Sequence, residues 1–246
     1  MSKYFTFSFD DGITQDYRIT EIFRSCGFYG CTFFINTGLC GVSWDWVGRQ
    51  FGRPDVPHLR LTEDQLRSGI YDGFDVAVHT LHHPSLKMYD DTPEKITEEV
   101  GRDAENIKRI FGVSPVGMSW PGGEFQCTEK TIKTILQTTD IRYSRAVEPT
   151  YDFRIPDDFM LWRPTCSFSD GKVMELAEKF ISYDGGGDAL FYVWCHGYEL
   201  DFNDSYGKLN ELASLMTRQD DVICVNNTEF YKACMDGRIS RNGERS

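Results

Sequence analysis

The sequence has few basic side chains for its length. Its 246 residues include 26 Lys and Arg against 38 Asp and Glu, which gives a formal net charge of −12. Nucleic acids and anionic membranes attract proteins through clustered positive charge, and here the basic residues are thinly spread. The composition therefore predicts no nucleic-acid partner and no membrane-surface partner, and it disfavours polyanionic substrates.

Long apolar runs are also missing. The chain enters a strand-like segment directly, without an apolar stretch flanked by positive charge, and no later run is long enough to cross a bilayer. We therefore expect no signal peptide, no membrane span and a cytoplasmic location. In that compartment, the eight irregularly spaced Cys predict buried, reduced thiols in place of disulfides or a structural zinc site.

Linkers, low-complexity tracts and internal repeats are absent from the sequence before Asn226. A length of 246 residues suits one large α/β domain. We predict a single domain over residues 1–237 and a flexible tail over residues 238–246, whose composition lacks apolar periodicity. The sequence does not indicate an oligomeric state.

The segment around which the rest is organised lies at the start of the chain. Residues 3–9 (KYFTFSF) are dense in aromatic and hydroxylated side chains and predict a β-strand that runs straight into Asp10, Asp11 and Gly12. A solvated turn is the plain interpretation of Asp-Asp-Gly. Two adjacent carboxylates repel unless a cation or a shared proton separates them, so a metal site is the alternative.

Strand-like and helix-like segments alternate along the rest of the chain. The expected helices are 13–25, 61–71, 93–111, 128–138, 172–180 and 206–216, and the expected strands are 31–36, 74–78, 116–120, 141–145, 189–195 and 222–225. Residues 41–60 form an irregular insertion whose aromatic side chains either pack on the fold or wall a groove for sugar rings. At least six βα units predict a parallel sheet and a barrel-type α/β fold.

Polar or Gly-rich motifs follow four of the expected strands, and the first of them is Asp10-Asp11-Gly12 after strand 3–9. Three of the five His (79, 82 and 83) follow strand 74–78, Pro-Gly-Gly follows strand 116–120, and His196 follows strand 189–195. That placement is typical of an active site at the C-terminal edge of a barrel. The plainer interpretations are a solvated loop for the three His and a core histidine for His196.

The chemistry of these residues suits a metal-dependent hydrolase. Asp11, His79 and His83 supply one carboxylate and two imidazoles, the set preferred by Zn²⁺, with Co²⁺, Ni²⁺ and Mn²⁺ as alternatives, and they leave positions open for water and substrate. The i, i+4 spacing lets His79 and His83 point the same way, with His82 pointing elsewhere. Asp10 is then available as a general base and His196 as the acid for the leaving group.

These motifs, in this order, resemble those of the polysaccharide deacetylases, the NodB-homology or carbohydrate esterase 4 family. The resemblance spans roughly residues 4–200 and rests on Phe9–Gly12, His79–Pro84, Trp120–Gly123 and Trp194–Glu199. It implies a single-domain irregular (β/α) barrel of the NodB-homology type, with the catalytic domain over residues 1–237, that removes acetyl groups from sugars with a divalent metal. It also implies that Asp10 is the catalytic base and His196 the catalytic acid. Asp11, His79 and His83 would be the three metal ligands.

The sequence departs from the family pattern at two places. Many relatives have an Arg just before the proline of the third motif, where it orients the base; Ser119 and Trp120 stand there in this chain. Arg145, at another strand end, is our candidate catalytic replacement, and a purely structural ion pair is an equally good interpretation of it. Cys195 stands where similar sequences often have Gly and is expected to narrow the surroundings of the acid.

The predicted activity is metal-dependent deacetylation of an acetylated saccharide, with N-acetyl groups preferred, which is hydrolysis of a carbon–nitrogen bond in a linear amide. Relatives that act on cell-wall polymers are exported, and no export signal is expected here. A soluble saccharide and a small non-sugar amide, as in allantoinase-like members of the superfamily, both stay open as substrates. A non-catalytic carbohydrate-binding protein on the same barrel is the alternative from another class, and it is weakened because base, ligands and acid are all present.

Overall fold

The centre of the sheet is strand β1 (Lys3–Asp11), whose nine residues are all buried. Strand β7 (Ala189–His196) pairs with one edge of β1 from Lys3 to Asp10. The opposite edge is shared, because β8 (Val222–Cys224) pairs with its first residues and β2 (Cys31–Ile35) with its last. Gly30 lies at the junction of β2 and β8, where a Cβ would come within 2.9 Å of the Val225 backbone nitrogen, so only glycine lets the two segments meet there.

The structure is a computed structural model that describes residues 2–239. In this part of the chain the sheet has eight strands in the order β5-β4-β3-β2-β1-β7-β6, with β8 added on β1, and every pair is parallel. The remaining strands are β3 (Asp75–Val78), β4 (Gly117–Ser119), β5 (Tyr143–Arg145) and β6 (Cys166–Ser167).

The sheet curls so that its two outer strands are joined by one segment of the chain. Trp162 forms an isolated parallel bridge with Arg145 of β5, and four residues later the same segment becomes β6 and pairs with β7. The result is a curled α/β half-barrel in one domain, which confirms the irregular barrel expected from the sequence.

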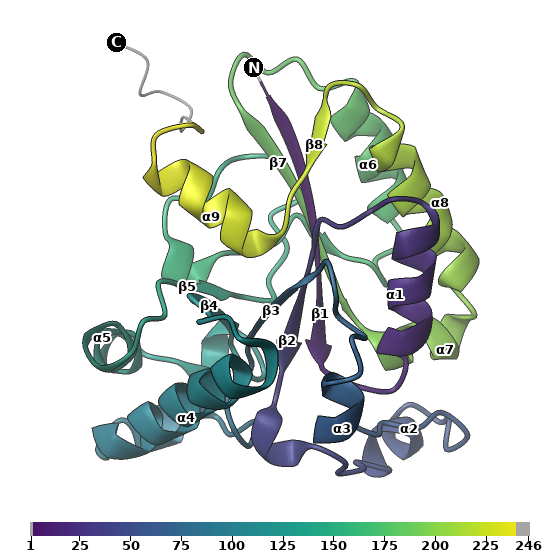
Figure 1. The fold of residues 1–246 in the computed structure, drawn as a ribbon. Coiled ribbons are helices and arrows are strands. Elements are labelled where there is room, and N and C mark those ends of the chain that lie inside the picture. The colour runs from purple at the N-terminus through teal and green to yellow at the C-terminus, as the bar shows by residue number, and fades with distance from the viewer. Residues whose placement is uncertain (1, 240–246) are drawn as a thin grey trace.

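Most of the helices flank the outside of the sheet, whereas α9 packs against the face that carries Tyr4 (Figure 1). In Figure 1, α4 and α5 lie on one side, α1, α6 and α8 on the other, α9 near the end where β1 begins, and α2 and α3 near its arrowhead. Their bounds are α1 (Asp16–Ser25), α2 (Trp46–Gln50), α3 (Glu63–Leu66), α4 (Pro93–Phe111), α5 (Glu129–Thr138), α6 (Val173–Ile181), α7 (Gly197–Asn203), α8 (Tyr206–Thr217) and α9 (Asn227–Met235).

The alternation of side chains along β1 separates two apolar clusters. Phe5, Phe7 and Phe9 belong to the larger cluster, which also contains the buried residues of α1 and α4. Tyr4 belongs to a second cluster with residues of β2, β3, β5, β7 and α9. The positions in register with Tyr4 are Thr6, Ser8 and Asp10, so the barrel interior becomes polar towards the C-terminal end of the strand.

Several expected elements differ in the structure. The helix expected over 61–71 is only α3, which ends at Leu66. Gly69 then adopts a left-handed conformation (φ 85°) that a helix cannot continue through, and the Arg24 guanidinium donates to the carbonyls of Gly69, Ile70 and Asp72. The sequence analysis also missed α2, β6, α7 and α9. For α9 a signal was present, since Asn226 and Glu229 form a capping box.

The end of the chain belongs partly to the fold. Of the tail predicted over residues 238–246, Arg238 and Ile239 are described, and both backbone N–H groups donate to the Ala233 carbonyl. Ile239 is buried in the same cluster as Tyr4 and Phe230. Residues 240–246 lie outside the described part of the chain.

Candidate active site

The two carboxylates at the end of β1 reach the same site because the backbone turns at Asp11. In a regular strand, neighbouring side chains point to opposite faces of the sheet. Asp11 has φ 79°, the left-handed region, and Gly12 follows with φ 63°. A Cβ on Gly12 would come within 2.8 Å of the Ile35 side chain. As a result, Asp10 and Asp11 each place a carboxylate oxygen 3.7 Å from His79 Nε2.

The histidine loop after β3 has the same kind of backbone. Thr80 (φ 66°) and His83 (φ 57°) are left-handed, so three of the five non-glycine residues with positive φ in the described chain belong to the site. The His83 N–H donates to Thr80 Oγ1 at 3.0 Å, and the His79 N–H lies 2.9 Å from the Ile35 carbonyl and 3.2 Å from Asp103 Oδ2. Strained backbone of this kind persists where surrounding contacts hold it, and it clusters at functional sites.

Asp11, His79 and His83 form a group that could hold a metal ion. One donor atom from each lies within 4.8 Å of the others, and Asp11 Oδ1 is 3.7 Å from His79 Nε2 and 3.8 Å from His83 Nε2. His79 Nδ1 is 3.1 Å from the Ser119 carbonyl, which only accepts, so its proton belongs on Nδ1. His79 Nε2 is then a buried lone pair without a hydrogen-bond partner. A cation is the group that this orphaned atom fits.

The protonation states of the three residues also suit a cation. Burial lowers the pKa of His79 to about 4 and lowers the pKa of His83. Burial alone would raise the pKa of Asp11, but the hydrogen bond from His58 and the nearby cationic groups hold it well below its usual value. At neutral pH the group therefore presents two neutral imidazoles and one carboxylate, which are the ligand forms that bind metals.

Arg145 contacts Asp10 directly. Its Nη2 donates to Asp10 Oδ2 in a buried ion pair, and its guanidinium carbon lies 4.2 Å from the centre of the Trp194 ring. Although burial alone would raise the pKa of Asp10, Arg145, followed by His79 and His196, brings it below the ordinary value. The contact required for Arg145 to replace the missing Arg is present, and it keeps Asp10 ionised. Ser119 also lies beside Asp10, with its Oγ 2.6 Å from His79 Nδ1 and 3.4 Å from Asp10 Oδ1.

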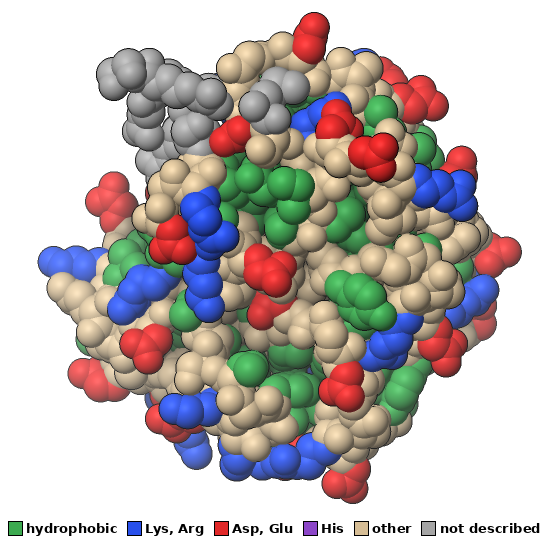
Figure 2. Space-filling model, turned by 45° about the horizontal axis from the view of Figure 1, so that its top comes forward, with side chains coloured by type: hydrophobic (Ala, Val, Ile, Leu, Met, Phe, Trp, Pro, Cys, Tyr) green, Lys and Arg blue, Asp and Glu red, His purple; other side chains and the backbone are tan. Residues whose placement is uncertain are grey.

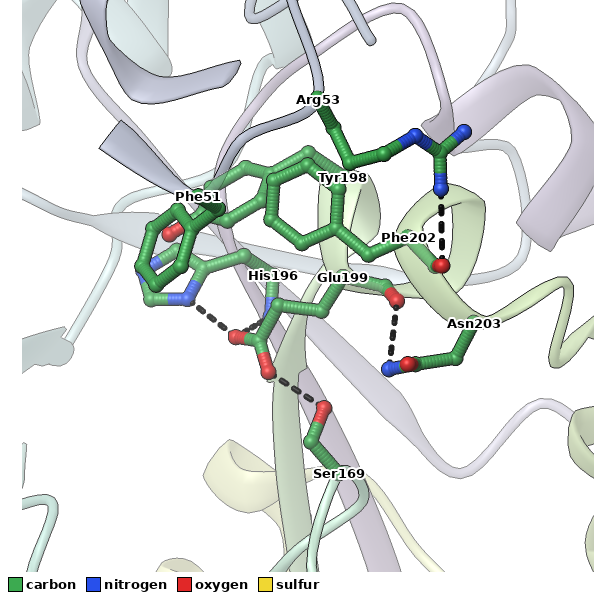
Figure 3. A pocket seen from close by; sticks show the side chains of 8 residues that line it. All are labelled: Phe51, Arg53, Ser169, His196, Tyr198, Glu199, Phe202 and Asn203. Atoms are coloured by element: carbon green, nitrogen blue, oxygen red, sulfur yellow. Dashed lines mark hydrogen bonds and ion pairs between the residues drawn. The ribbon is translucent and has the colours of Figure 1, made fainter. Parts of the chain in front are cut away.

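His196 ends β7 opposite Asp10, and a carboxylate supports it from behind (Figure 3). Glu199 Oε1 lies 2.7 Å from His196 Nδ1, and its Oε2 accepts from the Ser169 hydroxyl. The other ring nitrogen, Nε2, is 4.0 Å from Asp11 Oδ2. Burial would lower the pKa of His196, but Glu199, followed by Asp11 and Asp10, outweighs burial and raises the pKa to about 9. The imidazole is therefore a protonated ring at neutral pH, aimed at the site.

A cavity of about 590 Å³ opens next to His196. Phe51 of the 41–60 insertion, which is 56% exposed, and Tyr198 and Phe202 of α7 provide its aromatic side chains (Figure 3). Arg53 ties the insertion to α7 by donating to the Phe202 carbonyl at 2.8 Å. Trp44 of the insertion packs against His58 and His83, whereas Phe51 walls a cavity; that this cavity takes a sugar ring stays a prediction.

The structure thus brings all six predicted site residues together, and His82 points elsewhere, towards Glu99. The sequence analysis missed two others, His58 and Arg60, which the insertion places against Asp11. The signal available was their spacing, because residues two apart in an extended segment share a face. The sequence analysis also named Glu199 only as part of a motif and did not predict its contact with His196.

The chain belongs to the polysaccharide deacetylase family, whose family model matches residues 2–144. No curated protein matches the chain in sequence. Among the matching solved structures, a candidate polysaccharide deacetylase from Mycobacterium smegmatis aligns with all of this chain and 94% of its own, with 16% identity and a TM-score of 0.63.

Two further structures share this fold. A family 4 carbohydrate esterase from Streptomyces lividans, in complex with acetate, aligns with 90% of this chain and 91% of its own, with 13% identity and a TM-score of 0.55. A pseudoenzyme of the same esterase family from Bacillus anthracis aligns with 93% of this chain and 65% of its own, with 15% identity and a TM-score of 0.54. At these identities the likeness shows the fold alone, and the fold houses both an esterase and a pseudoenzyme.

Charged side chains of both signs lie on the surface, and acidic and basic groups are interspersed over the face shown in Figure 2. Among the described residues, no helix is long and apolar enough to cross a membrane.

Proposed function

We propose that this protein is a metal-dependent deacetylase that hydrolyses N-acetyl groups of a carbohydrate. The observation that supports this most directly is the buried, unpartnered His79 Nε2, which shares a small space with a carboxylate oxygen of Asp11 and the imidazole of His83. Family membership supports an acetylated saccharide as the substrate.

Asp11, His79 and His83 would hold the metal. Two imidazoles and one carboxylate favour Zn²⁺, with Co²⁺, Ni²⁺ and Mn²⁺ as alternatives, over Mg²⁺, which prefers oxygen ligands. When bound there, a divalent ion would supply the Lewis acidity needed to polarise the acetyl carbonyl.

The remaining steps belong to side chains of this chain. Asp10, kept ionised by Arg145, takes a proton from the attacking water as the oxygen–carbon bond forms. His196 Nε2 then gives its proton to the sugar nitrogen as the carbon–nitrogen bond breaks, so the products are acetate and an amine. Glu199 stays hydrogen-bonded to Nδ1 and balances the charge of the imidazolium.

The cavity beside His196 lies on the side where the leaving sugar would be. Its aromatic walls suit the apolar face of a sugar ring, which packs on aromatic side chains, and Glu199 offers a carboxylate at its base. The same volume would also accept a small non-sugar amide, which stays the alternative substrate class.

Two measurements on one sample test the proposal. Acetate release is measured on a panel of N-acetylated and O-acetylated sugars, and metal content is measured on the same purified protein. We expect about one divalent ion per chain, its loss in His79→Ala, and its retention in Asp10→Asn together with a fall in activity of at least ~10²-fold, the usual scale for a general base. Metal binding without acetate release from any substrate would instead indicate a non-catalytic member of the family.

A further inference from the structure

Asp11 receives two hydrogen bonds from the 41–60 insertion, one on each carboxylate oxygen. His58 Nε2 lies 2.8 Å from Oδ2, and Arg60 Nη2 lies 3.2 Å from Oδ1. The two oxygens have different surroundings, because Oδ1 is the one that lies 3.7 Å from His79 Nε2 and 3.8 Å from His83 Nε2. His58 therefore holds Oδ2, which lies 4.0 Å from His196 Nε2, and Arg60 contacts Oδ1, the oxygen that faces His79 and His83.

Both residues are held in place by packing. Their side chains are 1% exposed, His58 stacks on Trp44 at 5.6 Å between ring centres, and the Arg60 guanidinium lies 3.8 Å from the centre of the same ring. Arg60 Nε also reaches Asn36 Oδ1 at 3.4 Å, and the Asn36 amide donates to the Thr80 carbonyl at 2.9 Å, in the histidine loop.

Each of the two side chains also has a buried nitrogen without a hydrogen-bond partner, His58 Nδ1 and Arg60 Nη1. A buried unpaired polar atom costs free energy, so the remaining hydrogen bonds of these side chains are the reason to keep them here. For both residues those bonds include the one to Asp11. The insertion thus brings two polar side chains to one carboxylate although each keeps a buried nitrogen without a hydrogen-bond partner.

We propose that His58 and Arg60 are positioning residues that set the metal occupancy of this site with opposite signs, an inference that rests on the metal-binding role proposed above for Asp11. His58 fixes the carboxylate rotamer by holding Oδ2, which leaves Oδ1 facing His79 and His83. Arg60 places a permanent positive charge on Oδ1 and competes with the metal for it. Occupancy is then limited by Arg60 and supported by His58.

The physical reason for the opposite signs is charge. A hydrogen bond from an imidazole to the outer oxygen of a ligating carboxylate orients that ligand, and such outer partners typically contribute 10-fold to 100-fold to metal affinity. A guanidinium cannot lose its proton in a protein, so a divalent ion arriving at Oδ1 must displace a fixed positive charge or bind beside it.

The test is a Zn²⁺ titration of the metal-free, full-length protein in competition with a chromogenic chelator, which reports affinity without any substrate. His58→Phe keeps a ring against Trp44 and removes the hydrogen bond; we expect Zn²⁺ affinity to fall at least ~10-fold, with partial recovery in His58→Gln, which restores a donor. Arg60→Met keeps an apolar stem against Trp44 and removes the charge; we expect affinity to rise at least ~3-fold, whereas Arg60→Lys, which keeps the charge, stays near wild type.

Two controls separate these effects from a loosened insertion. Arg53→Gln removes the tie between the insertion and α7 without touching Asp11, and it should leave Zn²⁺ affinity within about twofold of wild type. The visible absorption spectrum of the Co²⁺-loaded protein should change in His58→Phe and not in Arg53→Gln, because only the first alters a ligand's orientation. If His58→Phe does not fold, the Arg60→Met and Arg60→Lys pair decides by itself.

Three outcomes would each overturn the inference. They are unchanged Zn²⁺ affinity in His58→Phe, equal losses of affinity in His58→Phe and Arg53→Gln, and weaker Zn²⁺ binding in Arg60→Met. These outcomes differ from failure of the proposed function. A protein that binds Zn²⁺ with the expected dependence on residues 58 and 60 but releases no acetate contradicts the deacetylase proposal alone. A protein that releases acetate and loses Zn²⁺ in His79→Ala, with both new positions silent, contradicts only this inference.

Discussion

Replacing Glu199 by Gln tests how the proposed catalytic acid is kept protonated. The substitution keeps the size of the side chain and an acceptor oxygen but removes the negative charge that lies 2.7 Å from His196 Nδ1. Burial lowers the pKa of His196, but nearby carboxylates raise it to about 9, and Glu199 contributes most among them. An acid must be protonated to act, so activity is present below this pKa and is lost as the pH rises through it.

The size of the effect follows from the pair. An opposite charge within hydrogen-bonding distance shifts a pKa by ~1–3 units, so Glu199→Gln should bring the pKa of His196 from about 9 to ~7. At pH 8 the protonated fraction then falls from ~0.9 to ~0.1, which predicts a roughly tenfold loss of kcat/KM at this pH and little loss at ~pH 6.

The assay is the pH profile of kcat/KM on an N-acetylated sugar, compared with wild type and with Ser169→Ala. Ser169→Ala removes the hydroxyl that donates to Glu199 Oε2 but leaves the carboxylate charge in place, so its alkaline limb should move much less. An alkaline limb that stays at the wild-type position in Glu199→Gln would refute the pairing of Glu199 and His196 as the acid, and so would a loss that is the same at every pH.

Three further predictions concern other buried groups. Arg145→Met should move the acidic limb of kcat/KM to higher pH, because the pKa of Asp10 rises when its nearest cation is lost; an unmoved limb would leave Arg145 with a structural role only. His196→Ala should keep its metal and lose far more kcat/KM on an N-acetyl sugar than on a nitrophenyl acetate, because the nitrophenolate departs without a proton. Equal losses on both substrates would assign His196 a structural or oxyanion role. Burial raises the pKa of Asp16 from 3.8 to about 8, so the free energy of unfolding should fall as the pH rises between these values, by up to ~1.4 kcal/mol per pH unit. Urea unfolding at several pH values measures this slope, which Asp16→Asn should lack. An equal slope in both proteins would assign the titration to another group.

The alternation of strands and helices could be predicted from the sequence because it depends on neighbours. The aromatic residues of β1, the Pro93 start and Gly112 end of α4, and the apolar run of β7 are local signals. The prediction was weaker for the 61–71 segment. The helix there ends at Leu66, before the left-handed Gly69, and the Arg24 guanidinium that binds the Gly69 and Ile70 carbonyls comes from outside the segment.

The candidate site divides in the same way. The ligand types and their spacing are visible in the sequence, because Asp10-Asp11-Gly12 and His79 to His83 each lie within one short segment. What the sequence could not show is that Asp11 is left-handed and so turns its carboxylate to the same side as that of Asp10. Gly12, which follows in the same left-handed region, lies so close to Ile35 of the neighbouring strand that a Cβ there would come within 2.8 Å of its side chain.

The partners of the two carboxylates were decided by tertiary structure alone. Arg145 reaches Asp10 across 135 positions and His58 reaches Asp11 across 47, and neither distance in sequence predicts a contact. Sheet order brings the ends of β1 and β5 to the same edge, and the insertion folds back over it. The sequence by itself therefore predicts which groups could hold a metal and which could move protons. The curled sheet determined which cations and carboxylates face them, because those contacts exist only when distant strand ends share one edge.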